Sequence, residues 1–174
     1  PGAGVQSGIL DSEYVAAGAT VTKDSIKSAD VVLRVRRPRA DELLDYKQGA
    51  ILVALMDPYG NETAINALAN SGVTGFAMEL MPRITRAQSM DILSSQANLA
   101  GYKAVLNAAE LYGRAMPMMM TAAGTVPPAR AFVMGVGVAG LQAIATAKRL
   151  GAAVSATDVR PATKEQVASL GGKF

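Results

Sequence analysis

The sequence predicts an α/β protein with two lobes of parallel sheet and a long helix that joins them. Half of the 174 residues are hydrophobic and only 18% are charged, whereas about a quarter are charged in an average globular domain. Short apolar runs alternate with helical segments, as in parallel sheets covered by helices. We therefore divide the chain into a partial first lobe over residues 1–93, a connecting helix over 94–114 and the first half of a second lobe over 115–174.

Three apolar runs of the first lobe are predicted to be strands. They are residues 29–36 (ADVVLRVR), 50–56 (AILVALM) and 73–80 (VTGFAMEL). Two helical segments, 39–49 and 62–71, separate them, and a glycine stands at or just after the end of each helix. This order of strands and helices predicts parallel pairing.

Polar groups gather where the first two of these strands end. The turn DPYGN, residues 57–61, follows the second strand, and its Asn61 can cap the next helix. Asp57 and Tyr59 either line a cleft between the lobes or serve the turn alone. The arginines of RVRRPR (34–39) either face a phosphate or an acidic partner, or form a solvated strand end.

The connecting helix is predicted to start near Ser94. Leu99 and Tyr102 lie at helical spacing on one side, and Val105 and Tyr112 are apolar on another. A helix with two apolar sides is expected to be buried between two bodies.

The segment 115–130 contains two prolines that interrupt regular structure. Its methionines, at positions 116 and 118–120, either pack in a core or form an adaptable contact surface near a ligand.

The second lobe opens with an apolar strand at 131–134 and a G-x-G-x-x-G motif at Gly135, Gly137 and Gly140. The first glycine permits a tight turn, the second lets a pyrophosphate approach the backbone, and the third lets the following helix pack on the strand. The N–H groups at the start of that helix can then hold phosphates. The motif predicts a dinucleotide site, and the alternative is a purely structural turn.

A second strand, residues 153–157, ends at Asp158, eighteen residues after Gly140. An acid at this place can accept hydrogen bonds from the ribose hydroxyls of adenosine, so the segment is predicted to be a Rossmann-like lobe. The carboxylate would repel the 2′-phosphate of NADP(H), which Arg160 could attract, and NAD(H) is therefore the predicted ligand. Such a fold has two halves, and we expect the nicotinamide-side half to be absent, so that this lobe is truncated.

The composition excludes several kinds of chemistry. The net charge is only +3 and tryptophan is absent, so we predict no nucleic-acid partner. The absence of Cys and His removes disulfides, thiolate metal sites, Cys nucleophiles and the commonest general base, and no metal site is predicted. The apolar stretch 131–147 fits a strand, turn and helix better than a membrane span. The first residue is not Met and no signal peptide is evident, so we expect a fragment.

Three stretches resemble one protein family. They are RAQSMDILSSQANLAGYKAV (86–105), PMMMTAAGTVPPA (117–129) and GVGVAGLQAIATAKRLGA (135–152), followed by ATDVR and TKEQVASLGGKF. Together they resemble the NAD(H)-binding domain I of the proton-translocating NAD(P) transhydrogenase alpha subunit. The alanine dehydrogenases share this architecture more loosely. The resemblance implies a two-lobed domain I that binds NAD(H) and forms a homodimer.

The same resemblance implies partners and a location. A separate domain III holds NADP(H) and receives the hydride, and a membrane domain couples the transfer to proton movement. Domain I would be peripheral on the cytoplasmic side of the inner membrane, or in the mitochondrial matrix of a eukaryote. The activity would be that of a Re/Si-specific NAD(P)+ transhydrogenase, and we expect the isolated chain to be inactive and unable to pump protons.

The family's nicotinamide loop matches Arg83, Gln88, Asp91 and Ser94 in this chain. The resemblance gives Arg83 a contact near the nicotinamide and turns Gln88 toward the NADP(H) side. Asp91 and Ser94 would orient the dihydronicotinamide and its carboxamide. The residue pattern alone also allows a solvated loop in which Arg and Asp pair and Ser94 caps a helix. On the adenosine side the family matches Val138, Asp158, Val159 and Arg160.

Two other functions stay open: an amino-acid dehydrogenase of the alanine dehydrogenase class, and a non-catalytic NAD-binding module. In the dehydrogenases a catalytic His falls in the region that matches residues 53–61, and a Lys matches Arg36. This chain has neither residue type at these places. Hydride transfer between two nicotinamides needs aligned rings and no proton acceptor, which suits a chain without His.

Overall fold

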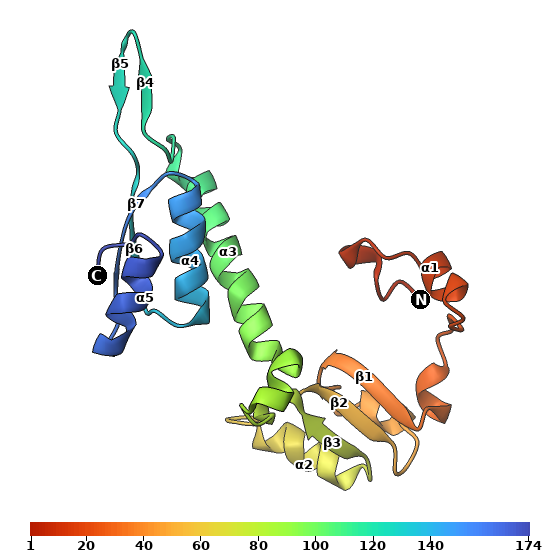
Figure 1. Cartoon of the computed structure of the whole chain (residues 1–174). Helices are drawn as coiled ribbons and strands as arrows, with labels where there is room; N and C mark the ends of the chain where they lie inside the picture. Colours follow the sequence, from red (N-terminus) through yellow and green to blue (C-terminus); the bar gives the residue numbers. More distant parts are fainter. The chain divides into compact units, whose positions relative to one another are not determined.

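The computed structural model describes all residues from 1 to 174 and divides into two compact units, residues 1–89 and 90–174. Each unit is described by itself (Figure 1). The predicted α/β fold with parallel sheets is confirmed. None of the helices is both long and apolar enough to cross a lipid bilayer.

The first unit contains a three-stranded parallel sheet in the order β1-β2-β3. Its elements are α1 (Asp11–Ala16), β1 (Val31–Arg36), β2 (Ile51–Leu55), α2 (Glu62–Asn70) and β3 (Thr74–Ala77). The register places Leu52 of the middle strand beside Val32 of β1 and Gly75 of β3. Because all three strands run in the same direction, their carboxyl ends meet at one edge of the sheet.

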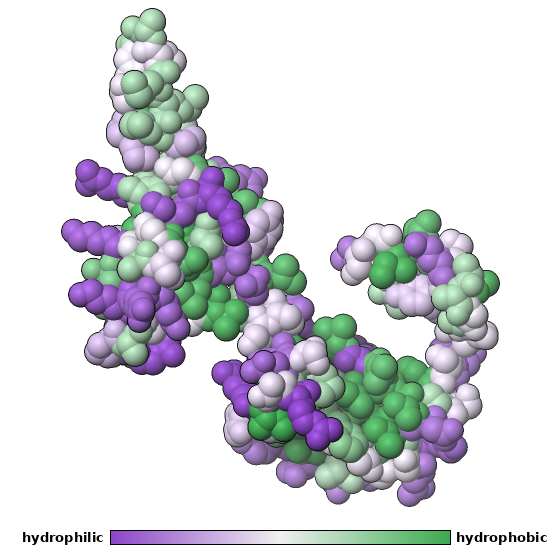
Figure 2. Space-filling view, viewed as in Figure 1, coloured by the Kyte–Doolittle hydropathy of each residue, from purple (hydrophilic) through white to green (hydrophobic).

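The two faces of this sheet differ in burial. Leu52 and Ala54 point to a core that includes Leu68 of α2 and is almost closed to solvent. On β1, Leu33 and Val35 are 75% and 80% exposed, and Figure 2 shows hydrophobic side chains gathered over the strands of this unit.

The second unit combines a long helix, a hairpin and a two-stranded parallel sheet, β6-β7. Its elements are α3 (Ile92–Tyr112), β4 (Met119–Thr121), β5 (Gly124–Val126), β6 (Arg130–Met134), α4 (Val138–Arg149), β7 (Ala153–Thr157) and α5 (Lys164–Ser169). Lys173 adds a parallel bridge to Ser155 on β7. The apolar stretch 131–147 is thus a strand, a turn and a helix, as predicted.

The core of the second unit lies around α4. Ile144 of α4, Val136 of the preceding turn and Val167 of α5 are almost completely buried. On α3, Gly101 and Val105 are the buried residues. α3 packs closely on α4 along this side.

Several sequence predictions differ from the structure. The helix predicted over 39–49 is only a 3-10 turn at Glu42–Asp45. The third strand ends at Ala77, and a second 3-10 turn, Met78–Leu80, follows it. Both segments are short of the periodic apolar contacts that keep longer elements in register.

The apolar surfaces of α3 and of the methionine segment also differ from the predictions. Leu99 and Tyr102 of α3 are 57% and 46% exposed, so only the Val105 side of this helix is buried. Segment 115–130 contains the antiparallel hairpin β4–β5. Met120 on this hairpin is 73% exposed, which contradicts core packing for the hairpin methionines, while Met116 does pack against the core.

Candidate functional site

The glycine-rich turn between β6 and α4 has a distinct geometry at each glycine. Gly135 has a φ of +92°, a left-handed conformation that residues with a side chain rarely adopt. At Gly137, a Cβ atom would meet nothing within 4 Å. At Gly140, a Cβ atom would lie 1.9 Å from the carbonyl oxygen of Gly135. The turn therefore requires glycine at its first and third positions and leaves open space at the second.

The start of α4 is suited to an anion. Gly137 is its N-cap residue, no acidic residue lies in its first turn, and Lys148 and Arg149 lie in its last turn. Unpaired N–H groups and the helix dipole give such a terminus a partial positive charge that favours phosphate groups. Val138, the first residue of α4, is 42% exposed at this place.

Asp158 lies at the carboxyl end of β7, beside the glycine turn. Its Oδ2 accepts a hydrogen bond from the backbone N–H of Val136 at 2.7 Å. Its Oδ1 accepts from the backbone N–H of Arg160 at 2.8 Å and from the Arg160 Nε at 2.9 Å. The structure thus brings Asp158, Arg160 and the turn together, while Val159 between them is almost fully exposed.

The Arg160 guanidinium, and after it the N–H groups of Val136 and Arg160, hold the pKa of Asp158 well below its ordinary value. A carboxylate with a depressed pKa contributes to stability above its unfolded pKa of about 3.9 and loses this contribution only as the pH falls further. Asp158 is therefore ionised throughout the neutral range.

The four residues matched to the nicotinamide loop fall in two places. Arg83 and Gln88 are exposed residues of the first unit, and Gln88 lies in a 3-10 helix over Thr85–Met90. Asp91 and Ser94 belong to the second unit and contact each other, since Asp91 accepts from the Ser94 N–H at 3.0 Å and from its Oγ at 2.7 Å.

These contacts correct one alternative from the sequence. Asp91, not Ser94, is the N-cap of α3, and the helix begins at Ile92, two residues before Ser94. The Ser94 hydroxyl is held by the capping carboxylate, so the pair is fixed at the helix start.

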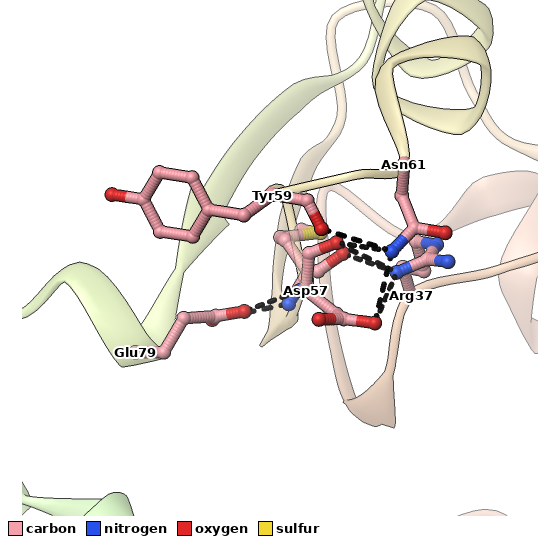
Figure 3. Close-up of polar contacts among 6 residues, drawn as sticks. Arg37, Asp57, Tyr59, Asn61 and Glu79 are labelled. Carbon is pink, nitrogen blue, oxygen red and sulfur yellow. Dashed lines mark hydrogen bonds and ion pairs between the residues drawn. The ribbon is translucent and has the colours of Figure 1, made fainter.

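A polar network that the sequence did not predict lies at the carboxyl ends of β1, β2 and β3 (Figure 3). Its centre is Asp57, which has a φ of +46° and is the one non-glycine residue with a positive φ. Arg37 Nη1 donates to the carbonyl oxygens of Met56 at 2.6 Å and Asp57 at 3.1 Å. The Glu79 carboxylate accepts from the backbone N–H groups of Met56 and Asp57.

This network also corrects the predicted cap of α2. Asn61 stands at the N-cap position but makes no side-chain capping bond. Its amide instead donates to the carbonyl oxygen and the carboxylate of Asp57, each at 3.0 Å. Strained residues of this kind persist where surrounding bonds fix them. Glu79 lies just before the 81–91 loop, so the network ties the start of that loop to the end of β2.

We expect Glu79→Gln to loosen this connection. Glutamine keeps one acceptor but turns an NH2 group toward a backbone N–H, and the loss should be about 1–2 kcal/mol of unfolding free energy. Urea unfolding and amide hydrogen exchange at Met56 and Asp57 measure it. Glu110→Gln, at an exposed position of α3, should change stability by less than about 0.5 kcal/mol. Unchanged exchange at both amides would show that Glu79 does not hold the loop.

A separate apolar groove of about 420 Å³ runs between α3 and β6, with Val105, Phe132 and Val133 among its walls. It includes neither the glycine turn nor Asp158. No group of three or more acidic side chains is arranged as metal ligands would be. The glycine turn with Asp158 is therefore the best supported candidate site.

Comparison with known proteins gives matches over nearly the whole chain. The family model described as alanine dehydrogenase/PNT, N-terminal domain, matches residues 1–100, and the corresponding C-terminal domain matches residues 104–174. The first of the separate chains that make up the NAD(P) transhydrogenase subunit alpha of Rhodospirillum rubrum is 60% identical over 99% of this chain and 47% of its own length.

Two solved structures agree with these matches. The transhydrogenase of Sinorhizobium meliloti superposes with a TM-score of 0.96 at 71% identity, over 99% of this chain and 50% of that one. An L-alanine dehydrogenase superposes with a TM-score of 0.80 at 25% identity, over 97% of this chain and 47% of that one. The chain thus spans about half the length of the proteins it matches.

Proposed function

Because this chain belongs to the alanine dehydrogenase/PNT family, we propose that it is the NAD(H)-binding component of a proton-translocating transhydrogenase. It would bind NADH and present it for hydride transfer to NADP+ on a separate domain. The observation that carries this proposal is the geometry at the second unit's glycine turn. Open space at Gly137, a helix N-terminus without acidic residues and an ionised Asp158 lie together there.

The residues present fit a dinucleotide. The pyrophosphate would be held at the turn and by the first N–H groups of α4, with Val138 beside it. Asp158 would accept hydrogen bonds from the adenosine ribose, with Val159 and Arg160 alongside. When bound, NADH supplies the hydride, and this chain's residues bind and orient it.

At the nicotinamide end we propose roles for Arg83, Gln88, Asp91 and Ser94. The Asp91–Ser94 pair is already fixed at the start of α3, which favours an orienting role. Arg83 and Gln88 are exposed, so their side chains are available for a cofactor or for the NADP(H)-binding domain. Positioning of two nicotinamides needs no general base, and this chain has no His.

We further propose a homodimer through this domain, partnered with an NADP(H)-binding domain III and a membrane domain. The protein would be attached to the cytoplasmic side of the inner membrane, or its mitochondrial equivalent, through those partners. The relative in R. rubrum is named as one portion of a subunit, which supports an assembly of several components.

The alternative function is an alanine dehydrogenase-like activity, favoured only by the shared family and fold. Oxidative deamination needs an acid–base group. The turn at 57–61 offers Asp57, whose carboxylate is bonded to Asn61, and it contains no His. Pyruvate- and ammonia-dependent oxidation of NADH by the intact protein would support this alternative, and we expect none.

The first test is a titration of the intact protein with NADH and, separately, NADPH, followed by cofactor fluorescence. We expect saturable binding that prefers NADH. Asp158→Ala should weaken NADH binding about 10- to 100-fold, because charge-assisted hydrogen bonds to the ribose are lost. Asp158→Asn keeps the size of the side chain and should weaken binding in the same direction.

The control for this test is Asp24→Ala, which removes an exposed carboxylate from the first unit. It should leave the dissociation constant unchanged. A folded Asp158→Ala protein that binds NADH as the wild type does would rule out the ribose role. Equal affinity of the wild type for NADH and NADPH would rule out Asp158 as the selector.

A further inference from the structure

The carboxylate of Asp158 has no acceptor position left. Each carboxylate oxygen has two lone pairs. Oδ1 accepts from the N–H and the Nε of Arg160, and Oδ2 accepts from the N–H of Val136 and, at 3.1 Å, from Arg160 Nη2. Two of the four donors belong to the backbone and two belong to the Arg160 guanidinium. A ribose that is to bind Asp158 must displace two of them.

We propose that the Arg160 guanidinium competes with the adenosine ribose for Asp158 and must leave the carboxylate when NAD(H) binds. This inference rests on the proposed function. The backbone donors are fixed by the turn and by the end of β7, so they stay. Departure of the guanidinium frees one position on each oxygen, which is what the two hydroxyls of a ribose diol require.

The exposure of the two side chains shows which of them can move. The Arg160 side chain is 61% exposed, whereas that of Asp158 is 5% exposed. Arginine can therefore turn into water, where its charge is solvated, while Asp158 remains in place. The carboxylate is ionised in both arrangements, because its pKa is depressed, so the exchange requires no proton transfer.

Arg160 also connects Asp158 to the glycine turn. Its Nη2 donates to the carbonyl oxygen of Val136 at 3.2 Å. Val136 is therefore held from both sides, by its N–H on Asp158 and by its carbonyl on Arg160. When the guanidinium leaves, only the N–H bond to Asp158 remains of these two contacts.

A competitor of this kind lowers affinity in proportion to the fraction of protein in which it occupies the site. Exposed ion pairs are weak, and removing Arg160 should therefore tighten ribose binding only about two- to fivefold. The gain should be specific for ligands with a ribose diol. It therefore identifies Arg160 as a residue that sets the selectivity of the adenosine end.

The test uses a neutral ligand, because Arg160 also attracts the phosphates of NADH through space. The dissociation constants of adenosine and 2′,3′-dideoxyadenosine are measured by competition with NADH fluorescence, on intact wild type and on Arg160→Ala. Alanine keeps the backbone donor of residue 160. We expect adenosine to bind about two- to fivefold more tightly to the variant, with dideoxyadenosine unchanged. Arg160→Lys, which cannot form the two-pronged contact, should lie between.

A second measurement follows the guanidinium itself. In a 15N NMR spectrum, the Arg160 Nε–H should exchange slowly with water in the free protein and lose this protection when NADH or adenosine is added. Retained protection with ligand bound would overturn the proposal. So would an adenosine affinity that is unchanged or weaker in Arg160→Ala, or an equal gain for dideoxyadenosine. Wild type that binds no NADH overturns the proposed function and this inference with it, whereas NADH binding with unaltered adenosine affinity overturns the inference alone.

Discussion

Gly140→Ala is expected to destabilise the second unit and abolish NADH binding, whereas Gly137→Ala is expected to weaken NADH binding in a protein of ordinary stability. The two variants add the same methyl group three residues apart. Their separation would show which glycine serves the fold and which serves the ligand.

The reason for the first effect is a backbone clash. A Cβ atom on Gly140 would lie 1.9 Å from the Gly135 carbonyl oxygen and 2.9 Å from its carbonyl carbon. Neither atom belongs to a flexible side chain, so α4 must move away from the turn. The cost should reach or exceed the roughly 1–3 kcal/mol of ordinary overpacking, which lowers the unfolding midpoint by about 4–8 °C per kcal/mol in a unit of this size.

At Gly137 the added methyl meets open space. The residue has a φ of −85° and a ψ of −168°, an extended conformation that alanine also adopts. Alanine is a poorer N-cap than glycine but restricts the unfolded chain, so stability should change by less than about 1 kcal/mol. If a pyrophosphate passes close to this position, the methyl should weaken NADH binding roughly tenfold or more.

Calorimetry and NADH titration of both variants measure these effects. Wild-type NADH affinity in Gly137→Ala would show that the pyrophosphate does not pass this residue. A stable Gly140→Ala protein would show that α4 can be displaced without cost.

The second unit's site was the most predictable part of the molecule from sequence. Gly135, Gly140 and Asp158 are constrained by local geometry, because turn, close packing and strand end all fall within one strand–helix–strand segment. The residue types therefore carry the structural information directly. The strands were predictable for the same reason, since β1 and β2 are continuous apolar runs that lie inside the predicted limits.

The polar contacts were not predictable because they join residues far apart in the chain. The Glu79 carboxylate meets backbone groups 22 and 23 residues earlier, and no spacing rule indicates such a pair. The four hydrogen bonds on Asp158 also depend on where the Arg160 side chain folds back. The hairpin at 119–126 forms next to two prolines, which mark the end of β5 rather than exclude regular structure.

Gly101→Ala is expected to destabilise the second unit, although helix propensity alone favours the change. Alanine in the middle of a helix is better than glycine by about 1 kcal/mol. A Cβ atom on Gly101, however, would lie 2.1 Å from the carbonyl oxygen of Ala139 in the first turn of α4. The clash involves backbone on both helices, so we expect a net loss of about 1–3 kcal/mol. An isolated glycine inside the helical pattern was the one sequence signal for this contact.

The control is Asn107→Ala on the exposed side of the same helix, which should raise the unfolding midpoint slightly through propensity alone. Opposite signs for the two variants would assign the loss to the contact between α3 and α4. The contact also bears on function, because Ala139 lies between Gly137 and Gly140 at the start of α4. If α3 fixes this helix end, Gly101→Ala should weaken NADH binding even at temperatures where the protein is folded. Wild-type affinity in the folded variant would show that the phosphate-binding turn keeps its shape without support from α3.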